Sequence, residues 1–382
     1  MSEYQYYEFL ALDRPLTSEQ QEELRSLSSR ADITATRFVN VYNYGDFRGS
    51  PQKLMERYFD AFCHLANWGT RWLMFRFPCT LLDAETAKLY CHSDTASMTD
   101  TGEHIVISLR VDEEPDGAWL EGNGQLAGMV QARAELAVGD LRLLYLAWLL
   151  SVQWPGDDEE DETEPPVPAG LGDLSAALTA IAGFLGIDED LIAVAAEASP
   201  PVKESSDDGL ADWIAALPVA EKTELLMKVA DGSGAQVQAL LHRRFRASTA
   251  ESAAHPSPGR TAAQLWRAAE VRADERRQAE EQRRREEQAR KAAAEAAAYA
   301  RRLDDLAALG DTAWRQVDDM IATKKVSEYD RAVAQLRDLR ALAKRQGEDK
   351  PAEFAKSARE LRARYPTRPA LQERLDKSGM PR

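Results

Sequence analysis

Residues 261–309 read TAAQLWRAAEVRADERRQAEEQRRREEQARKAAAEAAAYARRLDDLAAL, and this stretch organises the rest of the chain. It contains no proline and no glycine, and it is rich in alanine, the residue with the highest helix propensity. Oppositely charged residues recur four positions apart, as in Glu281 with Arg285 and Glu287 with Lys291. Each such pair stabilises a helix by roughly 0.2–0.5 kcal/mol. The stretch therefore predicts one long helix, roughly 65–70 Å in length at ~1.5 Å rise per residue.

The apolar positions of this predicted helix decide whether it pairs with another helix. Between Arg272 and Arg290 they are Ala273, Ala279 and Ala289, which do not make the stripe that a coiled coil needs. We therefore expect a solvated single helix that acts as a strut between two globular ends, with a coiled coil as the alternative.

Beyond Gly310 the helical patterns become short. DTAWRQVDDMIA, VSEYDRAVAQLRDLRALAKRQG, PAEFAKSARELRARY and PALQERL follow one another with brief turns between them. Residues 310–382 therefore predict a short helical bundle that is similar to units of a helical-repeat protein. Because such bundles commonly offer a binding surface, the candidate partner-binding residues of this tail are Tyr329, Arg337, Arg340, Arg362 and Arg364.

On the other side of the long helix, two linkers are predicted. STAESAAHPSPG lies within residues 248–260, and GDDEEDETEPPVP fills residues 156–168 with acidic residues and prolines. Between them, residues 169–247 contain short helical patterns and predict a small helical domain.

Residues 1–155 predict a mixed α/β domain. Its predicted strands are 4–12, 37–44, 71–77, 104–111 and 118–121. One predicted helix follows Thr17, which matches a capping box with Gln20, and the others are 51–68, 83–89 and 141–150. The 51–68 helix is predicted because Ser50 can act as its N-cap, Pro51 is favoured in the first turn, and apolar residues recur at 3–4 spacing. The fold class is thus α+β: a mixed sheet covered by helices, then an all-helical remainder.

Charge is unevenly distributed along the chain. Of the total of −16, residues 1–155 carry 13 basic and 22 acidic residues, residues 156–260 carry 7 and 20, and residues 261–382 carry 28 and 22. The first two parts should repel nucleic acid and anionic membranes, so only the tail could attract them. The apolar run 141–154 is too short to span a bilayer. Three cysteines and no visible signal peptide favour the cytoplasm.

Two resemblances follow from longer stretches. YDRAVAQLRDLRALA, EFAKSARELRARY and RPALQERLDKSGM resemble the C-terminal helical region of bacterial SWIM zinc-finger proteins over about 50 residues, without the zinc-binding cysteine motif. The resemblance implies a protein-binding helical tail and no zinc chemistry. YQYYEFLALDRPLT and YNYGDFRGSPQKLMERYFDAF resemble an uncharacterised bacterial family, which implies no mechanism.

Candidate chemistry is sparse. The pairs Cys63-His64 and Cys91-His92 are adjacent residues, a spacing that structural zinc sites rarely use. GNGQLAG at 122–128 is more typical of a tight turn than of a phosphate loop, because its glycines do not match the GxGxxG spacing. We therefore predict no metal, no cofactor and no catalytic residue. The one surface patch singled out is Tyr42, Tyr44, Asp46, Phe47 and Arg48, since aromatic residues and arginine are enriched at contact centres.

These patterns favour a protein–protein interaction adaptor of a bacterial cytoplasmic complex, with another protein as partner. One alternative is an enzyme, or enzyme subunit, that uses Asp60, His64 and His92 in one cleft. The other is a nucleic-acid accessory protein acting through the basic C-terminal helices, although the interleaved acidic residues favour neutralisation within the helix.

Overall fold

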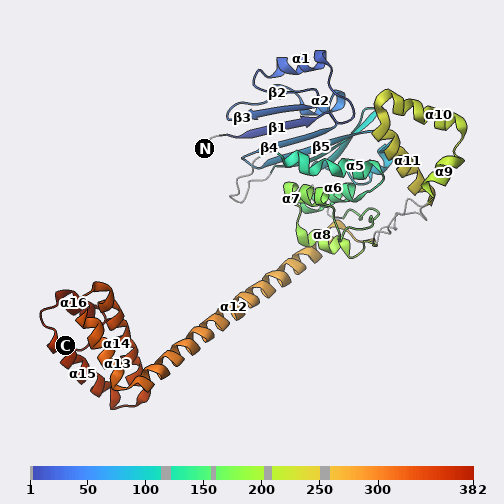
Figure 1. Cartoon of the computed structure of the whole chain (residues 1–382). Helices are drawn as coiled ribbons and strands as arrows, with labels where there is room; N and C mark the ends of the chain where they lie inside the picture. The colour runs from blue at the N-terminus through green and yellow to red at the C-terminus, as the bar shows by residue number, and fades with distance from the viewer. Residues whose placement is uncertain (1–2, 113–121, 156–160, 202–208, 250–258) are drawn as a thin grey trace. The chain divides into compact units, whose positions relative to one another are not determined.

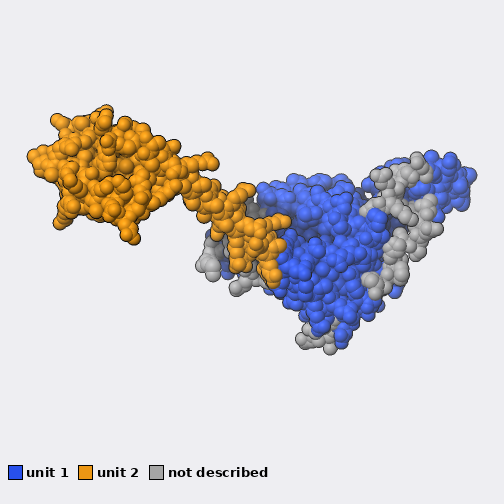
Figure 2. All heavy atoms as spheres, turned by 90° about the horizontal axis from the view of Figure 1, so that it is seen from below, with its two compact units in different colours: residues 1–276 blue, residues 277–382 orange. Residues whose placement is uncertain are grey.

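The computed structural model describes residues 3–112, 122–155, 161–201, 209–249 and 259–382. Contacts divide the chain into two compact units, residues 1–276 and residues 277–382 (Figure 2). Unit 1 contains a seven-stranded sheet, and unit 2 is helical (Figure 1). The α+β class predicted from the sequence is confirmed.

The sheet has the strand order β2-β3-β1-β4-β5-β7-β6, and every described pairing is antiparallel. The expected mixed sheet is therefore an antiparallel one. Its strands are β1 (Gln5–Leu10), β2 (Asp32–Ile33), β3 (Arg37–Tyr42), β4 (Ala61–Ala66), β5 (Thr70–Pro78), β6 (Ala96–Asp100) and β7 (His104–Asp112). The predicted strand at 118–121 lies outside the described residues.

Two different helical layers cover the two faces of the sheet (Figure 1). One face packs against α1 (Ser18–Leu27) and α2 (Pro51–Arg57), and the other packs against α4 (Gln125–Met129), α5 (Gln131–Ala137), α6 (Arg142–Gln153) and α7 (Ala176–Leu185). Thr17 caps α1 with Gln20 in a reciprocal capping box, as the sequence predicted. Asp83 caps α3 (Ala84–Lys88) at the edge of the second layer.

The predicted helix at 51–68 is wrong beyond its first turns. Ser50 caps α2 and Pro51 opens it, but the helix ends at Arg57 and the chain continues as β4. All six residues of β4 are buried because both faces of the sheet are covered there. A strand buried on both faces has no alternation of polar and apolar residues. Its apolar residues therefore also satisfied the 3–4 spacing expected for the apolar face of a helix.

The helices after α7 are α8 (Glu189–Ala196), α9 (Leu210–Ala216), α10 (Val219–Lys228) and α11 (Gly234–Thr249). A π-helical turn, η1 (Val229–Ser233), joins α10 to α11. Helices α7 and α8 share one apolar core with the sheet and with Leu265 and Ala269 of the long helix. Among the helices that the structure describes, none combines the length and the apolar character that crossing a bilayer requires.

The long helix α12 runs from Ala262 to Leu309. The predicted pairs Glu281–Arg285 and Glu287–Lys291 form at 2.5 and 2.7 Å, and their side chains are largely exposed. Arg276 instead donates to Asp190 on α8 at 2.8 Å, within unit 1. In unit 2, Leu303 and Leu306 of α12 pack with α13 (Asp311–Ala322), α14 (Val326–Gln346), α15 (Lys350–Arg364) and α16 (Pro369–Lys377).

Candidate functional site

The register of four neighbouring strands places four side chains in one row. Tyr7 of β1 lies opposite His64 of β4, His64 lies opposite Trp72 of β5, and Trp72 lies opposite Arg110 of β7. Directly opposed residues of antiparallel strands point to the same face of a sheet. We call Tyr7, His64, Trp72 and Arg110 the aromatic row; it lies on the face that α1 and α2 cover in part.

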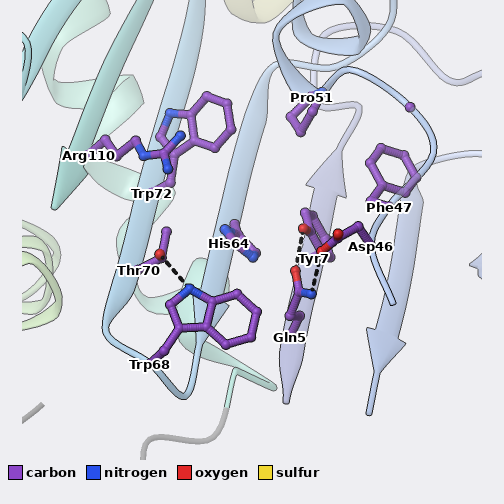
Figure 3. A pocket seen from close by; sticks show the side chains of 11 residues that line it. Gln5, Tyr7, Asp46, Phe47, Pro51, His64, Trp68, Thr70, Trp72 and Arg110 are labelled. Carbon is purple, nitrogen blue, oxygen red and sulfur yellow. Dashed lines mark hydrogen bonds between the residues drawn. The ribbon is translucent and has the colours of Figure 1, made fainter. Parts of the chain in front are cut away.

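The cover of this face ends at the aromatic row. Two residues along each strand, Phe9, Phe62 and Met74 form the next row on the same face. These three residues are fully buried beneath α1 and α2. At the aromatic row the surface is hollowed instead, with a volume of about 230 Å³. Around the row, this hollow is lined by Gln5, Asp46, Phe47, Trp68 and Thr70, among others (Figure 3).

His64 occupies the centre of the row, between the strands that carry Tyr7 and Trp72 (Figure 3). Its ring stacks on Tyr7 with centroids 4.2 Å apart and planes 22° apart. His64 is only 6% exposed, yet neither Nδ1 nor Nε2 has a hydrogen-bond partner among the described residues. Because a buried polar group without a partner costs roughly 1–3 kcal/mol, such a group calls for an explanation.

Burial sets the protonation state of this histidine. The pKa of His64 is lowered to about 4, mainly by desolvation and secondly by Arg110, while Asp112 and Asp46 oppose the shift. The imidazole is therefore neutral at pH 7, so one ring nitrogen donates a hydrogen bond and the other accepts one.

The polar neighbours of His64 already have partners inside the protein. Tyr7 donates its hydroxyl to Gln5 Oε1 at 2.6 Å, and burial raises the pKa of Tyr7 to about 12. Gln5 Nε2 donates to Asp46 Oδ1 at 3.0 Å, and Trp68 Nε1 donates to Thr70 Oγ1 at 3.0 Å (Figure 3).

The far end of the row is also internally paired. Trp72 Nε1 donates to Ser108 Oγ at 2.8 Å. Arg110 lies over the Trp72 ring at 5.2 Å and donates to Asp112 through Nε at 2.8 Å and Nη2 at 3.2 Å. His64 is thus the member of this network whose hydrogen-bonding capacity is unused.

The structure brings two of the five residues in the predicted surface patch to this hollow. Asp46 and Phe47 line it. Tyr42 packs edge-on against Tyr7 at 5.9 Å and accepts a hydrogen bond from Asn40. Tyr44 is 74% exposed and Arg48 is exposed, and neither lines the hollow.

The five predicted tail residues take different positions in unit 2. Tyr329 is buried in the helical core, and Arg337 is exposed. Arg340 donates to the carbonyl oxygen of Gly379 at 3.0 Å, Arg362 pairs with Asp376 at 2.5 Å, and Arg364 pairs with Asp318. Three of the four arginines therefore hold the bundle together.

The residues of the alternative enzyme site have separate partners. Asp60 pairs with Arg76 at 2.7 Å, and His92 contacts Glu162 at 2.9 Å, whereas His64 lies in the hollow. Cys63 packs in the core on the opposite face of the sheet from its neighbour His64, because successive side chains of a strand alternate. Across the described residues, no three His, Cys, Asp or Glu side chains gather as a metal site would require.

Comparison with known proteins adds no further constraint: the chain matches no protein-family model, no curated protein and no solved structure.

Sequence reasoning missed the central residues of the hollow. The predicted 51–68 helix includes His64, whereas the helix ends at Arg57 and His64 lies in β4, so the sequence does not identify its cross-strand neighbours. Trp72 lies in a correctly predicted strand, but nothing in the sequence places it in the same row as Tyr7. A usable signal is the polar Gln5 and the aromatic Tyr7 at alternate positions of a predicted strand, on the same side as the apolar Phe9.

The buried histidine predicts a pH-dependent stability. Because the folded pKa of about 4 lies below the ordinary 6.5, the unfolded chain binds more protons between these values, and stability falls as pH decreases. Between pH 7 and pH 5.5, the free energy of unfolding should fall by about 1 kcal/mol more in the wild type than in His64→Phe. Urea unfolding at both pH values measures this difference.

Tyr7→Phe is the matched control, since it removes a neighbouring hydroxyl and keeps the imidazole. It should retain the wild-type pH dependence. Equal pH dependence in wild type and His64→Phe would show that His64 is not held neutral by burial.

Proposed function

We propose that the protein is an interaction adaptor that binds one protein through the hollow in unit 1 and another through the helices of unit 2. The observation that carries the proposal is the hollow itself, where two tryptophans, a tyrosine and an arginine surround a buried imidazole with no hydrogen-bond partner in the described part of the chain. Tryptophan, tyrosine and arginine are the residues that most often dominate the binding energy of protein interfaces. We place the protein in the cytoplasm, in keeping with the absence of a disulfide among Cys63, Cys79 and Cys91.

The size and rigidity of the hollow favour a protein partner. At about 230 Å³ it is smaller than the 300–1,000 Å³ typical of drug-sized ligands, and it suits a single side chain. The internal hydrogen bonds of Gln5, Tyr7, Thr70 and Trp72 hold the lining in place before binding. A preorganised lining reduces the entropy lost on association.

Unit 2 offers a surface of different charge. A shallow hollow of about 430 Å³ is lined by Arg359, Arg362, Gln372 and Arg382, among others. Nη1 of Arg362 is buried and has no hydrogen-bond partner in the part of the chain that the structure describes. A basic surface in unit 2 and an acidic unit 1 favour two different partners, which is the property that defines an adaptor.

The proposal is tested by quantitative affinity purification of the full chain from its native host. We expect a stoichiometric partner that is retained by the wild type and lost by Trp68→Ala, because Trp68 is 44% exposed and lies at the hollow. Tyr299→Ala is the matched control: Tyr299 is also 44% exposed but lies on α12. A partner bound through unit 2 should be insensitive to Trp68→Ala and sensitive to Arg359→Glu.

Two outcomes would contradict the adaptor. One is a protein that emerges alone under gentle conditions. The other is a set of partners that Trp68→Ala and Tyr299→Ala reduce equally.

A further inference from the structure

The charges in and around the hollow determine whether it favours an anionic or a cationic ligand. Asp46 contributes one negative charge, Arg110 and Asp112 neutralise each other, and His64 is neutral. The surrounding sequence is acidic as well, since residues 1–155 carry 22 acidic and 13 basic residues. An anion entering this hollow would lose its hydration beside Asp46 without gaining an unpaired cation. A cation that enters the hollow instead gains an attractive interaction with the carboxylate of Asp46.

The walls of the hollow also favour a cation. The rings of Tyr7, Trp68 and Trp72 line the hollow, and tryptophan is the best aromatic partner for cations. The chain itself provides an example, because the guanidinium of Arg110 lies 5.2 Å from the centre of the Trp72 ring. A guanidinium is planar and weakly hydrated, so it stacks on aromatic rings at a lower desolvation cost than an ammonium.

His64 supplies the polar half of the recognition. A neutral imidazole has one nitrogen with a free lone pair, and this nitrogen accepts an N–H from a ligand. Gln5, Thr70 and Trp72 are engaged within the protein, so His64 and the exposed carboxylate of Asp46 are left to accept ligand hydrogens. A guanidinium carries five N–H groups and can donate to both acceptors while its plane rests on a ring.

We propose that the hollow receives the guanidinium of an arginine side chain from a basic segment of the partner protein. The inference rests on the proposed adaptor function and names the chemistry of the partner at that site. His64 accepts one N–H, Asp46 accepts another, and the aromatic rings hold the plane of the group. The unpaired imidazole, costly in the free protein, is thereby satisfied in the complex.

Three capped tripeptides with the sequence Gly-X-Gly test this assignment on the full chain by isothermal titration calorimetry at pH 7. X is arginine, lysine or citrulline, which has the shape of arginine without its charge. We expect the arginine peptide to bind at least tenfold more tightly than the citrulline peptide and severalfold more tightly than the lysine peptide. Citrulline binding as tightly as arginine would overturn the proposal.

Variants locate the binding. His64→Phe keeps the stack on Tyr7 and removes both ring nitrogens, so it should weaken arginine-peptide binding at least tenfold while its unfolding midpoint stays at or above that of the wild type. Asp46→Asn should also weaken binding. Asp32→Asn, an exposed carboxylate elsewhere in the sheet, removes the same charge and should not. Equal losses from Asp46→Asn and Asp32→Asn would reduce the effect to general charge attraction and overturn the site.

The result also separates this inference from the adaptor function. If the tripeptides fail to bind but partner capture depends on Trp68, the adaptor stands and the arginine assignment falls. If neither depends on the hollow, both fall.

Discussion

Replacing Asp60 by alanine should destabilise unit 1 by about 3–5 kcal/mol, the cost of leaving a buried charge without its partner. Asp60 is 1% exposed, and its Oδ1 accepts from Arg76 Nη2 at 2.7 Å. Its Oδ2 accepts from the backbone amides of Leu12 and Asp13, at 2.7 and 2.9 Å. Removing this carboxylate strands the Arg76 guanidinium inside the protein.

The same carboxylate lies close to the helical layer on the other face. Arg133 of α5 forms a bidentate pair with Asp13 and donates through Nε to the carbonyl oxygen of Arg76 at 2.8 Å. The loss should therefore spread from the sheet to α5. Urea unfolding followed by tryptophan fluorescence reports mainly on unit 1, since Trp314 is the sole tryptophan beyond residue 276.

The control for Asp60 is the exposed pair Glu23–Arg57, whose side chains are 48% and 60% exposed. Because surface ion pairs are screened by solvent, Glu23→Ala should cost at most about 1 kcal/mol. Replacing the buried pair by apolar residues, Asp60→Leu with Arg76→Met, should recover part of the stability lost in Asp60→Ala. A cost below about 1 kcal/mol for Asp60→Ala would show that the charge cluster does not hold the sheet and α5 together.

Replacing Glu164 by alanine should cost a similar amount, about 3–5 kcal/mol, for the same physical reason. Glu164 is 1% exposed and accepts two hydrogen bonds from Arg260, at 2.7 and 2.8 Å. The hydroxyl of Tyr145 on α6 donates to the same carboxylate. Burial and this carboxylate raise the pKa of Tyr145 well above its ordinary value, so the phenol remains a donor at physiological pH.

The position of Glu164 gives this substitution a wider effect. Backbone bonds join Glu164 to Arg260 and Ala262 to Glu162, both at 2.9 Å, immediately before and at the start of α12. Glu164→Ala should therefore loosen the N-terminal end of the long helix, which hydrogen exchange of the amides at 262–269 would report. Asp161→Ala, at an exposed position of the same segment, is the control and should change neither stability nor exchange. Unchanged exchange in Glu164→Ala would contradict this role.

Much of the fold followed from local sequence signals. The long helix, the capping box at Thr17, the short helix at 83–89 and the strands at 71–77 and 104–111 were predicted correctly because each depends on residues near it in the chain. The strand β4 was not, since burial on both faces removed its alternation. Because residues 61–66 were predicted as helix, the cross-strand neighbours of His64 could not be predicted.

The acidic segment at 156–168 shows a second limit. Its composition predicted a solvated linker, and residues 156–160 lie outside the described structure. Glu164, however, is buried, because Arg260 and Tyr145 surround it. Both partners are distant in sequence, and composition carries no information about such contacts. The hollow could not be predicted for the same reason, since its lining comes from four strands, the loop after β3, the start of α2 and the turn between β4 and β5.

We infer that the buried, neutral imidazole of His64 is the group in unit 1 that contacts a ligand. Nitrogen-15 NMR of the histidine rings in the full chain, with and without the arginine tripeptide and between pH 7.5 and pH 5.5, measures the state of this group. We expect His64 to remain neutral throughout, and we expect the arginine peptide, but not the citrulline peptide, to shift the resonance of its accepting nitrogen. A His64 ring that becomes protonated near pH 6.5, or whose nitrogens do not respond to the arginine peptide, would contradict it.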